Sequence, residues 1–265
     1  MRRITIGQYY QSDGILHRLD ARVKLAGTLL FILVLFFADN VAAYVAAAVF
    51  LGCMIVLSTV PVATIIRGMR AVIVLLCITV LFNLFLTPGE VLLYIGPLSI
   101  TKQGVSFAAM MAVRLFMLVA ASSIMTLTTT PNALTDAMEH FMKPLKKLRV
   151  PVHEIAMMMA IALRFIPILM EETDKIMKAQ RARGAKFDEG NVIQRAKSLI
   201  PVLVPLFVSA FRRANDLTLA MEARCYHGGD GRTKLYPLHY EARDRMAYAV
   251  LAAFLLAMIL LIRLL

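Results

Sequence analysis

The sequence has few charged residues, only three cysteines, and no motif for binding a nucleotide or a catalytic metal. Charged residues make up 17% of the 265 residues, whereas hydrophobic residues make up 60%, against a usual share of ~45–50%. A soluble domain of this composition would expose much of its apolar surface to water. The composition therefore predicts a polytopic membrane protein and excludes disorder, a coiled coil, collagen and a disulfide-rich secreted domain.

The missing motifs exclude several kinds of active site. Cys53, Cys77 and Cys225 are odd in number and far apart, so they predict neither a disulfide framework nor a metal site. No G-x-x-x-x-G-K-[ST] loop is present to hold nucleotide phosphates, and the His153-Glu154 pair lacks the second histidine of a zinc protease. We therefore expect a chain that is not an enzyme and binds no metal or cofactor of its own.

Five apolar segments have about the length needed to cross a bilayer, which is roughly 20 mostly apolar residues for a helix. They occupy residues 25–38, 41–60, 71–86, 105–127 and 246–265. The first two are joined by a very tight turn and are expected to form a helical hairpin. Five spans place the two ends of the chain on opposite sides of the membrane.

The net charge of +12 is distributed unevenly among the segments between these spans. Residues 1–24 hold five Lys and Arg, 61–70 hold two and 129–245 hold nineteen, whereas 39–40 hold none and 87–104 hold one. The positive-inside rule then predicts that the N-terminus and the 129–245 insert are cytoplasmic. Basic residues beside spans orient the chain and contact the headgroups of the lipid bilayer. We therefore expect no nucleic-acid partner.

The insert is predicted to form three helices, at residues 132–147, 153–183 and 192–224. The second and third have long apolar faces that are interrupted by charges and prolines, so we expect them to cross each other along the cytoplasmic membrane surface. Met158, Leu169 and Leu203 are candidate contact residues on these faces. In an alternative arrangement these two helices enter the membrane as a hairpin and give seven spans, which would place several charged side chains at membrane depth.

The predicted fold class is thus an all-α polytopic membrane protein with about five transmembrane helices and a three-helix cytoplasmic region inserted before the last span. Its expected divisions are 1–130 for the N-terminal segment and four spans, 131–236 for the cytoplasmic helices, and 237–265 for the last span.

A short motif, A-x-x-A-R-[G/C], ends both long helices of the insert, once at positions 179–184 and again at positions 220–225. The last three residues of the two copies are Ala182-Arg183-Gly184 and Ala223-Arg224-Cys225. Arginine at a helix C-terminus is favoured by the helix dipole and presents a forked donor to a carboxylate or carbonyl. Ordinary capping explains either copy alone, whereas the repetition favours two equivalent docking points for a partner with two similar halves.

Two further sets of charged residues have more than one interpretation. Arg114 lies inside the fourth predicted span, where it is either a functional group or a structural arginine that binds helix carbonyls or reaches a wet cavity. Asp20, Arg22 and Lys24 mark the start of the first span, and we interpret them as a solvated interfacial cluster.

Several segments together resemble the transmembrane T component of energy-coupling factor (ECF) vitamin transporters, and the resemblance covers nearly the whole chain. These segments are Gly7-Gln8-Tyr9, residues 12–25, Pro131, residues 163–167, the two Ala-Arg motifs, and Gly228-Gly229. The family's pattern "LHRLDPRTKL" is similar to residues 16–25 of this chain. No one of these segments is specific by itself.

The resemblance implies a non-enzymatic coupling subunit of an ATP-driven importer in the bacterial cell membrane. Its partners would be a pair of ATP-binding-cassette ATPases, which hold the ATP and Mg, and a membrane-embedded substrate-binding protein, the S component. The alternatives are a self-sufficient secondary transporter, which predicts inverted repeats and paired broken helices, and a polytopic membrane enzyme.

The resemblance also implies roles for particular residues. In that family the two motifs end cytoplasmic coupling helices that insert into grooves on the ATPases, so Arg183 and Arg224 are the expected contacts. The second copy departs from the family pattern because Cys225 stands where glycine is usual, which leaves the arginine in place.

Overall fold

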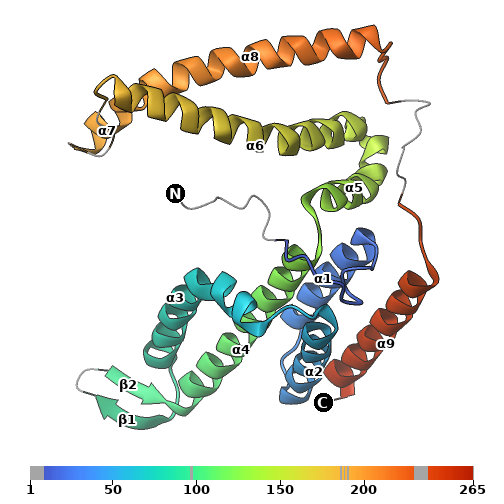
Figure 1. Cartoon of the computed structure of the whole chain (residues 1–265). Coiled ribbons are helices and arrows are strands. Elements are labelled where there is room, and N and C mark those ends of the chain that lie inside the picture. The colour runs from blue at the N-terminus through green and yellow to red at the C-terminus, as the bar shows by residue number, and fades with distance from the viewer. Residues whose placement is uncertain are drawn as a thin grey trace. The chain divides into compact units, whose positions relative to one another are not determined.

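The computed structural model describes residues 9–95, 98–185, 187, 189, 191–229 and 238–264. It is almost entirely helical (Figure 1), which confirms the predicted all-α class. The elements are α1 (Ala21–Phe36), α2 (Val41–Ser58), α3 (Val62–Leu86), β1 (Val91–Ile95), β2 (Leu98–Thr101), α4 (Lys102–Thr128), α5 (Pro131–Met142), a 3-10 helix η1 (Lys143–Leu148), α6 (Val152–Ala182), α7 (Val192–Ser198), α8 (Ile200–Ala223) and α9 (Ala242–Leu264).

The chain divides into two compact units. The first consists of Met1–His140 together with Leu238–Leu265, and the second is Phe141–Pro237. The first unit therefore contains α1 to α4, most of α5 and α9, while the second contains η1 and α6 to α8. The last helix of the chain thus packs with the first helices.

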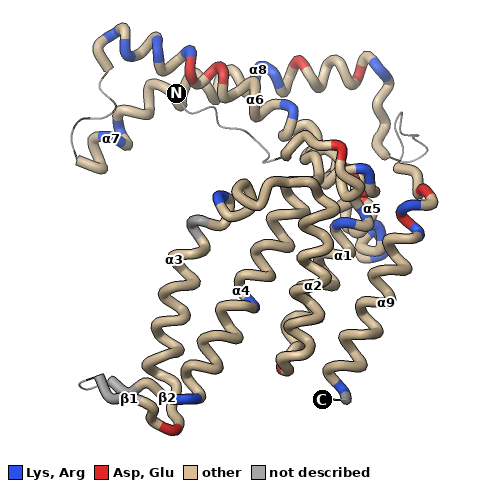
Figure 2. Tube along the Cα trace, turned by 60° about the horizontal axis from the view of Figure 1, so that its bottom comes forward, with Lys and Arg blue, Asp and Glu red and all other residues tan. Residues whose placement is uncertain are grey.

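The core of the first unit lies where α1, α2, α4 and α9 pack together. Phe31 and Leu35 of α1 and Met258 of α9 are buried there beside small residues such as Ala43 and Ala47 of α2. Small side chains at helix interfaces let backbones approach closely, as is usual in membrane bundles. Figure 2 shows few charges along these helices, and many large apolar side chains on them face outward, as lipid contact requires.

The ends of the helices in the first unit follow local sequence signals. The Asp20 side chain caps α1, and the Thr101 side chain caps α4 by accepting the Gly104 N–H at 3.0 Å. The β1–β2 hairpin joins α3 to α4 in a segment where the hydropathy pattern predicts only a connection between spans. Its strands are rich in β-branched, aromatic and leucine side chains on either side of a Gly-Pro pair, which is the local signal for this hairpin.

Hydropathy and helix length alone do not identify which helices span the membrane. Five helices are long and apolar enough, namely α2, α4, α6, α7 with α8, and α9, and α3 is a sixth if its two parts, bent by 64°, are one span. The sequence also predicts five spans, but they are not the same five helices. With only 16 residues, α1 is too short, whereas α6 and α8 are long and apolar enough. The predicted 61–70 loop is also wrong, since α3 begins at Val62.

The helices of the insert begin close to the predicted positions but are divided differently. The first ends at Met142, just before Pro144, and continues as η1. The third is broken at Leu199, so that Pro201 lies in the first turn of α8, where its missing N–H has no helical partner. Pro167 and Pro205 lie inside α6 and α8, which continue through them.

Candidate functional site

The two long helices of the second unit, α6 and α8, pack as an antiparallel pair (Figure 1). Glu172 of α6 accepts hydrogen bonds from Arg213 Nη2 at 2.9 Å and from Ser209 Oγ at 2.6 Å on α8. Near the end of α6, Gln180 Nε2 donates to the Pro201 carbonyl at 3.3 Å. The end of α6 therefore lies at the start of α8, and the two helix C-termini lie at opposite ends of the pair. The 24 residues of α8 separate them by about 36 Å.

The C-terminus of α6 is closed by a Schellman motif, in which a left-handed residue turns the chain and satisfies the last carbonyls. The Gly184 N–H donates to the Arg181 carbonyl at 3.0 Å, and the Ala185 N–H donates to the Gln180 carbonyl at 3.0 Å. Gly184 has a φ of 89°, which glycine adopts at little cost. The capping residue between helix and turn is Arg183.

The C-terminus of α8 repeats this motif at the second copy of the sequence pattern. The Cys225 N–H donates to the Glu222 carbonyl at 2.9 Å, and the Tyr226 N–H donates to the Met221 carbonyl at 3.1 Å. Cys225 has a φ of 54°, so it takes the left-handed conformation although it carries a Cβ. The backbone therefore has the geometry that favours glycine even where the sequence departs from it.

The two motif arginines have matching backbones and free side chains. Arg183 has φ −87° and ψ 7°, and Arg224 has φ −94° and ψ 12°. Both are exposed, and within the part of the chain that the structure describes neither guanidinium has an ion-pair partner. All six motif positions are exposed, namely Ala182, Arg183, Gly184, Ala223, Arg224 and Cys225. Each copy can therefore present one arginine to another molecule without first breaking a contact.

The three predicted apolar contact residues differ in exposure. Met158 is 58% exposed and Leu203 is 46% exposed, whereas Leu169 is half-buried. The antiparallel pairing places Met158 and Leu203 toward opposite ends of the pair. They belong to a larger set of exposed apolar side chains on the three helices: Ile166, Met170, Val192, Ile193, Leu199, Ile200, Val204, Phe207, Val208, Phe211 and Leu219.

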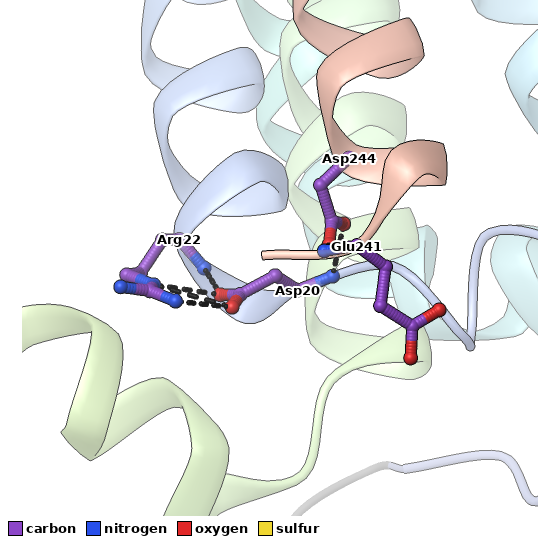
Figure 3. A network of polar contacts seen from close by, with 4 residues as sticks. All are labelled: Asp20, Arg22, Glu241 and Asp244. Carbon is purple, nitrogen blue, oxygen red and sulfur yellow. Dashed lines mark hydrogen bonds and ion pairs between the residues drawn. The ribbon is translucent and has the colours of Figure 1, made fainter. Parts of the chain in front are cut away.

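In the first unit, charged residues at the starts of α1 and α9 form a largely buried group that we call the polar corner: Asp20, Arg22, Lys24 and Asp244. The Arg22 and Asp20 side chains are only 8% and 3% exposed, and Arg22 Nη2 donates to Asp20 Oδ2 at 2.7 Å (Figure 3). Our interpretation of a solvated cluster is therefore wrong. Burial alone would raise the pKa of Asp20, but the hydrogen bonds from Arg22 outweigh it and hold the pKa below its ordinary value.

The polar corner joins three helices that are distant in the sequence. Asp244, in the first turn of α9, accepts the backbone N–H of Asp20 at 2.9 Å and that of Glu241 at 2.8 Å (Figure 3). Lys24 Nζ donates to the carbonyls of Thr128 at 2.8 Å and His17 at 3.1 Å. The beginnings of α1 and α9 are thus tied to the end of α4.

The segment before α1 is also held tightly against α2. A Cβ at Gly14 would lie 2.7 Å from Thr59 Oγ1 and 2.8 Å from the Ser58 carbonyl oxygen, so only glycine fits. Residues 16–25, which resemble the family pattern, lie where α1, α2, α4 and α9 meet. Gly7 and Gln8, which belong to the same resemblance, lie outside the described residues.

Arg114 of α4 makes contacts of the kind that a structural arginine requires. Its Nε donates to the Tyr44 hydroxyl at 2.8 Å, and its Nη2 donates to the Ala38 carbonyl at 2.7 Å. The exposed Asp39 carboxylate is 3.5 Å away. Arg114 thus binds the turn between α1 and α2, where carbonyls lack helical partners.

Sequence reasoning missed the partners of these residues. Asp244 follows Glu241 by three positions, a spacing typical of a helix N-terminus, and that signal identifies its capping bond but not its bond to Asp20. Among the residues that the structure describes, no group of three or more His, Cys, Asp or Glu side chains is placed to hold a metal ion.

Comparison with known proteins identifies the family. Residues 12–235 match the model of the CbiQ family, described as cobalt transport protein. The energy-coupling factor transporter transmembrane protein EcfT of Thermosediminibacter oceani is 50% identical over 248 residues, which are 94% of each chain. Those of Ruminiclostridium cellulolyticum and Clostridium kluyveri are 46% and 49% identical, over 98% and 92% of this chain and 97% and 91% of their own. With such similarity over nearly its whole length, the chain belongs to the family of energy-coupling factor transporter transmembrane proteins.

Proposed function

We propose that this chain is the membrane scaffold and coupling subunit of an ATP-driven importer for a vitamin or other micronutrient. In this role it carries the opening and closing of two ATP-binding-cassette ATPases to a membrane-embedded S component, which binds the substrate. The partner ATPases hold ATP and Mg, and this chain binds no cofactor.

The observation that carries the proposal is the pair of matching helix ends. Two Schellman motifs, one after α6 and one after α8, hold Arg183 and Arg224 in the same backbone geometry at opposite ends of one helix pair. A homologous pair of ATPases offers two similar surfaces, so two similar projections suit it. The planar guanidinium can form two hydrogen bonds with a carboxylate, which fixes direction as well as affinity.

The apolar side chains of α6 and α8 support a second contact, with the S component. Met158 and Leu203 are exposed although each helix has a partner in the pair, so this apolar surface remains for another molecule. Apolar contact is non-directional, which would let one surface accept S components of different sequence. Leu169 is half-buried and its substitution would also disturb packing within the chain.

We place α1, α2, α3, α4 and α9 across the bacterial cell membrane, with the N-terminus and residues 131–236 in the cytoplasm. The distribution of Lys and Arg supports this topology. The Glu172–Arg213 pair also supports a surface position for α6 and α8, since charged side chains are costly at membrane depth. Single cysteines at Asn40, Gly96 and Gly190 in a chain without native cysteines test it; Gly96 and Gly190 lie outside the described residues. Labelling of the Gly190 position only from outside the cell would contradict the topology.

The decisive experiment for coupling is the Arg183→Ala/Arg224→Ala double variant. Each arginine is expected to contribute roughly 2–5 kcal/mol to ATPase binding where its contact is desolvated. Co-purification of both ATPases and substrate uptake should therefore be lost, while the variant still inserts in the membrane. Lysine at both positions should restore little, because it lacks the planar fork.

Arg212→Ala is the matched control, because Arg212 is an exposed arginine of α8 outside the motif. It should keep both ATPases. Normal uptake and ATPase binding in the double variant would contradict the proposal, as would uptake by this chain in the absence of any ATPase.

A further inference from the structure

A cavity of about 440 Å³ lies within the first unit, between α1, α2, α4, α9 and the segment before α1. Its inner wall consists of buried apolar side chains, among them Leu16, Leu51, Ile124 and Leu251. Ligand sites in proteins have volumes of roughly 300–1,000 Å³ and mostly apolar walls. The cavity is therefore large enough for a small ligand or one flexible chain.

The shape of this cavity follows from the way α2 and α9 diverge. At one end the two helices are held together, since the Phe50 and Phe254 rings stack at 4.1 Å and Asn40 Nδ2 donates to the Leu261 carbonyl at 3.5 Å. Toward the other end they separate, as Figures 1 and 2 both show. Phe31 and Phe50 close the narrow end of the resulting wedge.

The wide part of the wedge is bordered by residues that are themselves exposed. Its rim includes Ile15, Leu57, Met246 and Val250, which are 58%, 36%, 66% and 51% exposed. These apolar side chains lie on α2, on α9 and on the segment before α1. In a membrane-spanning bundle, apolar side chains exposed in this way meet hydrocarbon chains.

Two cations also line the cavity, and no acidic side chain is among the described residues that line it. Arg243 is half-exposed at the rim and shares its guanidinium with Glu241, whose Oε2 is 2.8 Å away. Lys24 lies deeper, with its ammonium bound to two backbone carbonyls and, among the described residues, to no carboxylate at ion-pair distance. The wide end thus combines apolar walls with two cations, of which Arg243 shares its charge with Glu241.

We propose that this cavity binds one acyl chain of an anionic phospholipid, whose headgroup phosphate contacts Arg243. The apolar wedge suits a hydrocarbon chain, and the guanidinium at its mouth forms hydrogen bonds to phosphate oxygens at the level where headgroups lie. A transmembrane helix of a partner is about 10–12 Å across, and the narrow end of the wedge is closed by aromatic rings, so a helix suits the space poorly.

The chain contains no tryptophan, so a single introduced tryptophan reports on one position. Met246→Trp places it at the rim, and Leu256→Trp places a matched probe on the same helix at a residue that is 62% exposed and does not line the cavity. The full chain is reconstituted in phosphatidylcholine bilayers to which brominated phosphatidylglycerol or brominated phosphatidylcholine is added. Bromine quenches tryptophan only on close contact with the acyl chain.

The rim probe should be quenched at an about fivefold lower mole fraction of brominated phosphatidylglycerol than of brominated phosphatidylcholine. This is the ratio that one basic residue near a membrane surface typically provides. The Leu256→Trp probe should be quenched equally by both lipids. Equal quenching of the rim probe, or its resistance to both lipids, would overturn the proposal.

Two further variants separate the headgroup contact from the chain contact. Arg243→Gln in the Met246→Trp background should remove the preference for phosphatidylglycerol and keep the quenching. Gly27→Leu should reduce quenching by both lipids, because a Cβ there meets only Leu251, at 3.9 Å, and the rest of the side chain enters the cavity. The proposed site would be contradicted if the preference for phosphatidylglycerol survived Arg243→Gln. Full quenching in a folded Gly27→Leu variant would contradict it too.

Discussion

Two arginines of the first unit and two of the second are used in opposite ways. In the first unit, Arg22 and Arg114 are bound by groups of the same chain, and neither is available to a partner. In the second unit, Arg183 and Arg224 are exposed at helix ends and have no ion-pair partner among the described residues. The contrast shows that position in the fold, and not residue type, separates arginines that stabilise the chain from arginines free to bind another molecule.

The largest expected effect tests the buried side of this contrast. Arg22→Ala leaves the Asp20 carboxylate buried without its partner, which typically costs about 3–5 kcal/mol. Arg183→Ala removes no contact within the chain and should change the free energy of unfolding by at most about 0.5 kcal/mol. Thermal unfolding of both variants in detergent measures the difference.

A double variant shows whether the lost charge partner is the cause. Asp20→Asn/Arg22→Leu removes both charges but keeps an oxygen that can cap α1, so it should recover part of the loss. Equal Tm values for Arg22→Ala and Arg183→Ala would contradict the difference between the buried and the exposed arginines.

A smaller effect is expected at Arg114. Arg114→Leu leaves the Ala38 carbonyl and the Tyr44 hydroxyl without their donor, at a cost of about 1–3 kcal/mol. Tyr44→Phe removes only one of these bonds and should cost about 1 kcal/mol. Tm in detergent tests both variants, and ATPase co-purification should be unchanged. Loss of transport by Arg114→Leu at unchanged stability would instead favour a functional arginine.

The exposed apolar surface of the second unit allows a further test. Met158→Asp and Leu203→Asp should each weaken S-component binding by about tenfold or more, because an unpaired charge would be buried on contact. Stability and ATPase binding should remain nearly unchanged, since both positions are exposed. A pull-down of both partners from one membrane extract measures this. Loss of the ATPases before the S component would contradict the proposed division between the two surfaces.

The smallest effects are expected at the two left-handed residues. Cys225→Gly should stabilise the end of α8 by up to about 1 kcal/mol, because glycine has no Cβ to strain at a φ of 54°. Gly184→Ala should destabilise the end of α6 by a similar amount, and nothing lies within 4 Å of the added Cβ, so backbone strain is the cause. Hydrogen exchange in the last helical turns reports both changes, and shifts of the same sign would refute the equivalence of the two ends.

Sequence alone predicted the helices well and their partners poorly. Helix positions and the repeated Ala-Arg motif depend on local patterns, so positions 179–184 and 220–225 could be identified from the order of residues. The burial of Asp20 and Arg22 could not be predicted this way, because it depends on contacts with α9, at the other end of the chain. Hydropathy also could not decide whether α6 and α8 span the membrane or lie on its surface, because both helices are long and apolar enough to span.

The hydrogen bond between the Asp20 backbone and Asp244 has a consequence for biogenesis. A ribosome adds about 5–20 residues per second, so the segment from Thr128 to Asp244 requires about 6–23 s of synthesis after α4 is complete. During this interval the first four helices are already made, but the start of α1 lacks one of its partners. We therefore expect the nascent bundle to be vulnerable to membrane proteases until translation reaches α9, and pulse-labelled chains truncated before Glu241 should be degraded faster than the full chain.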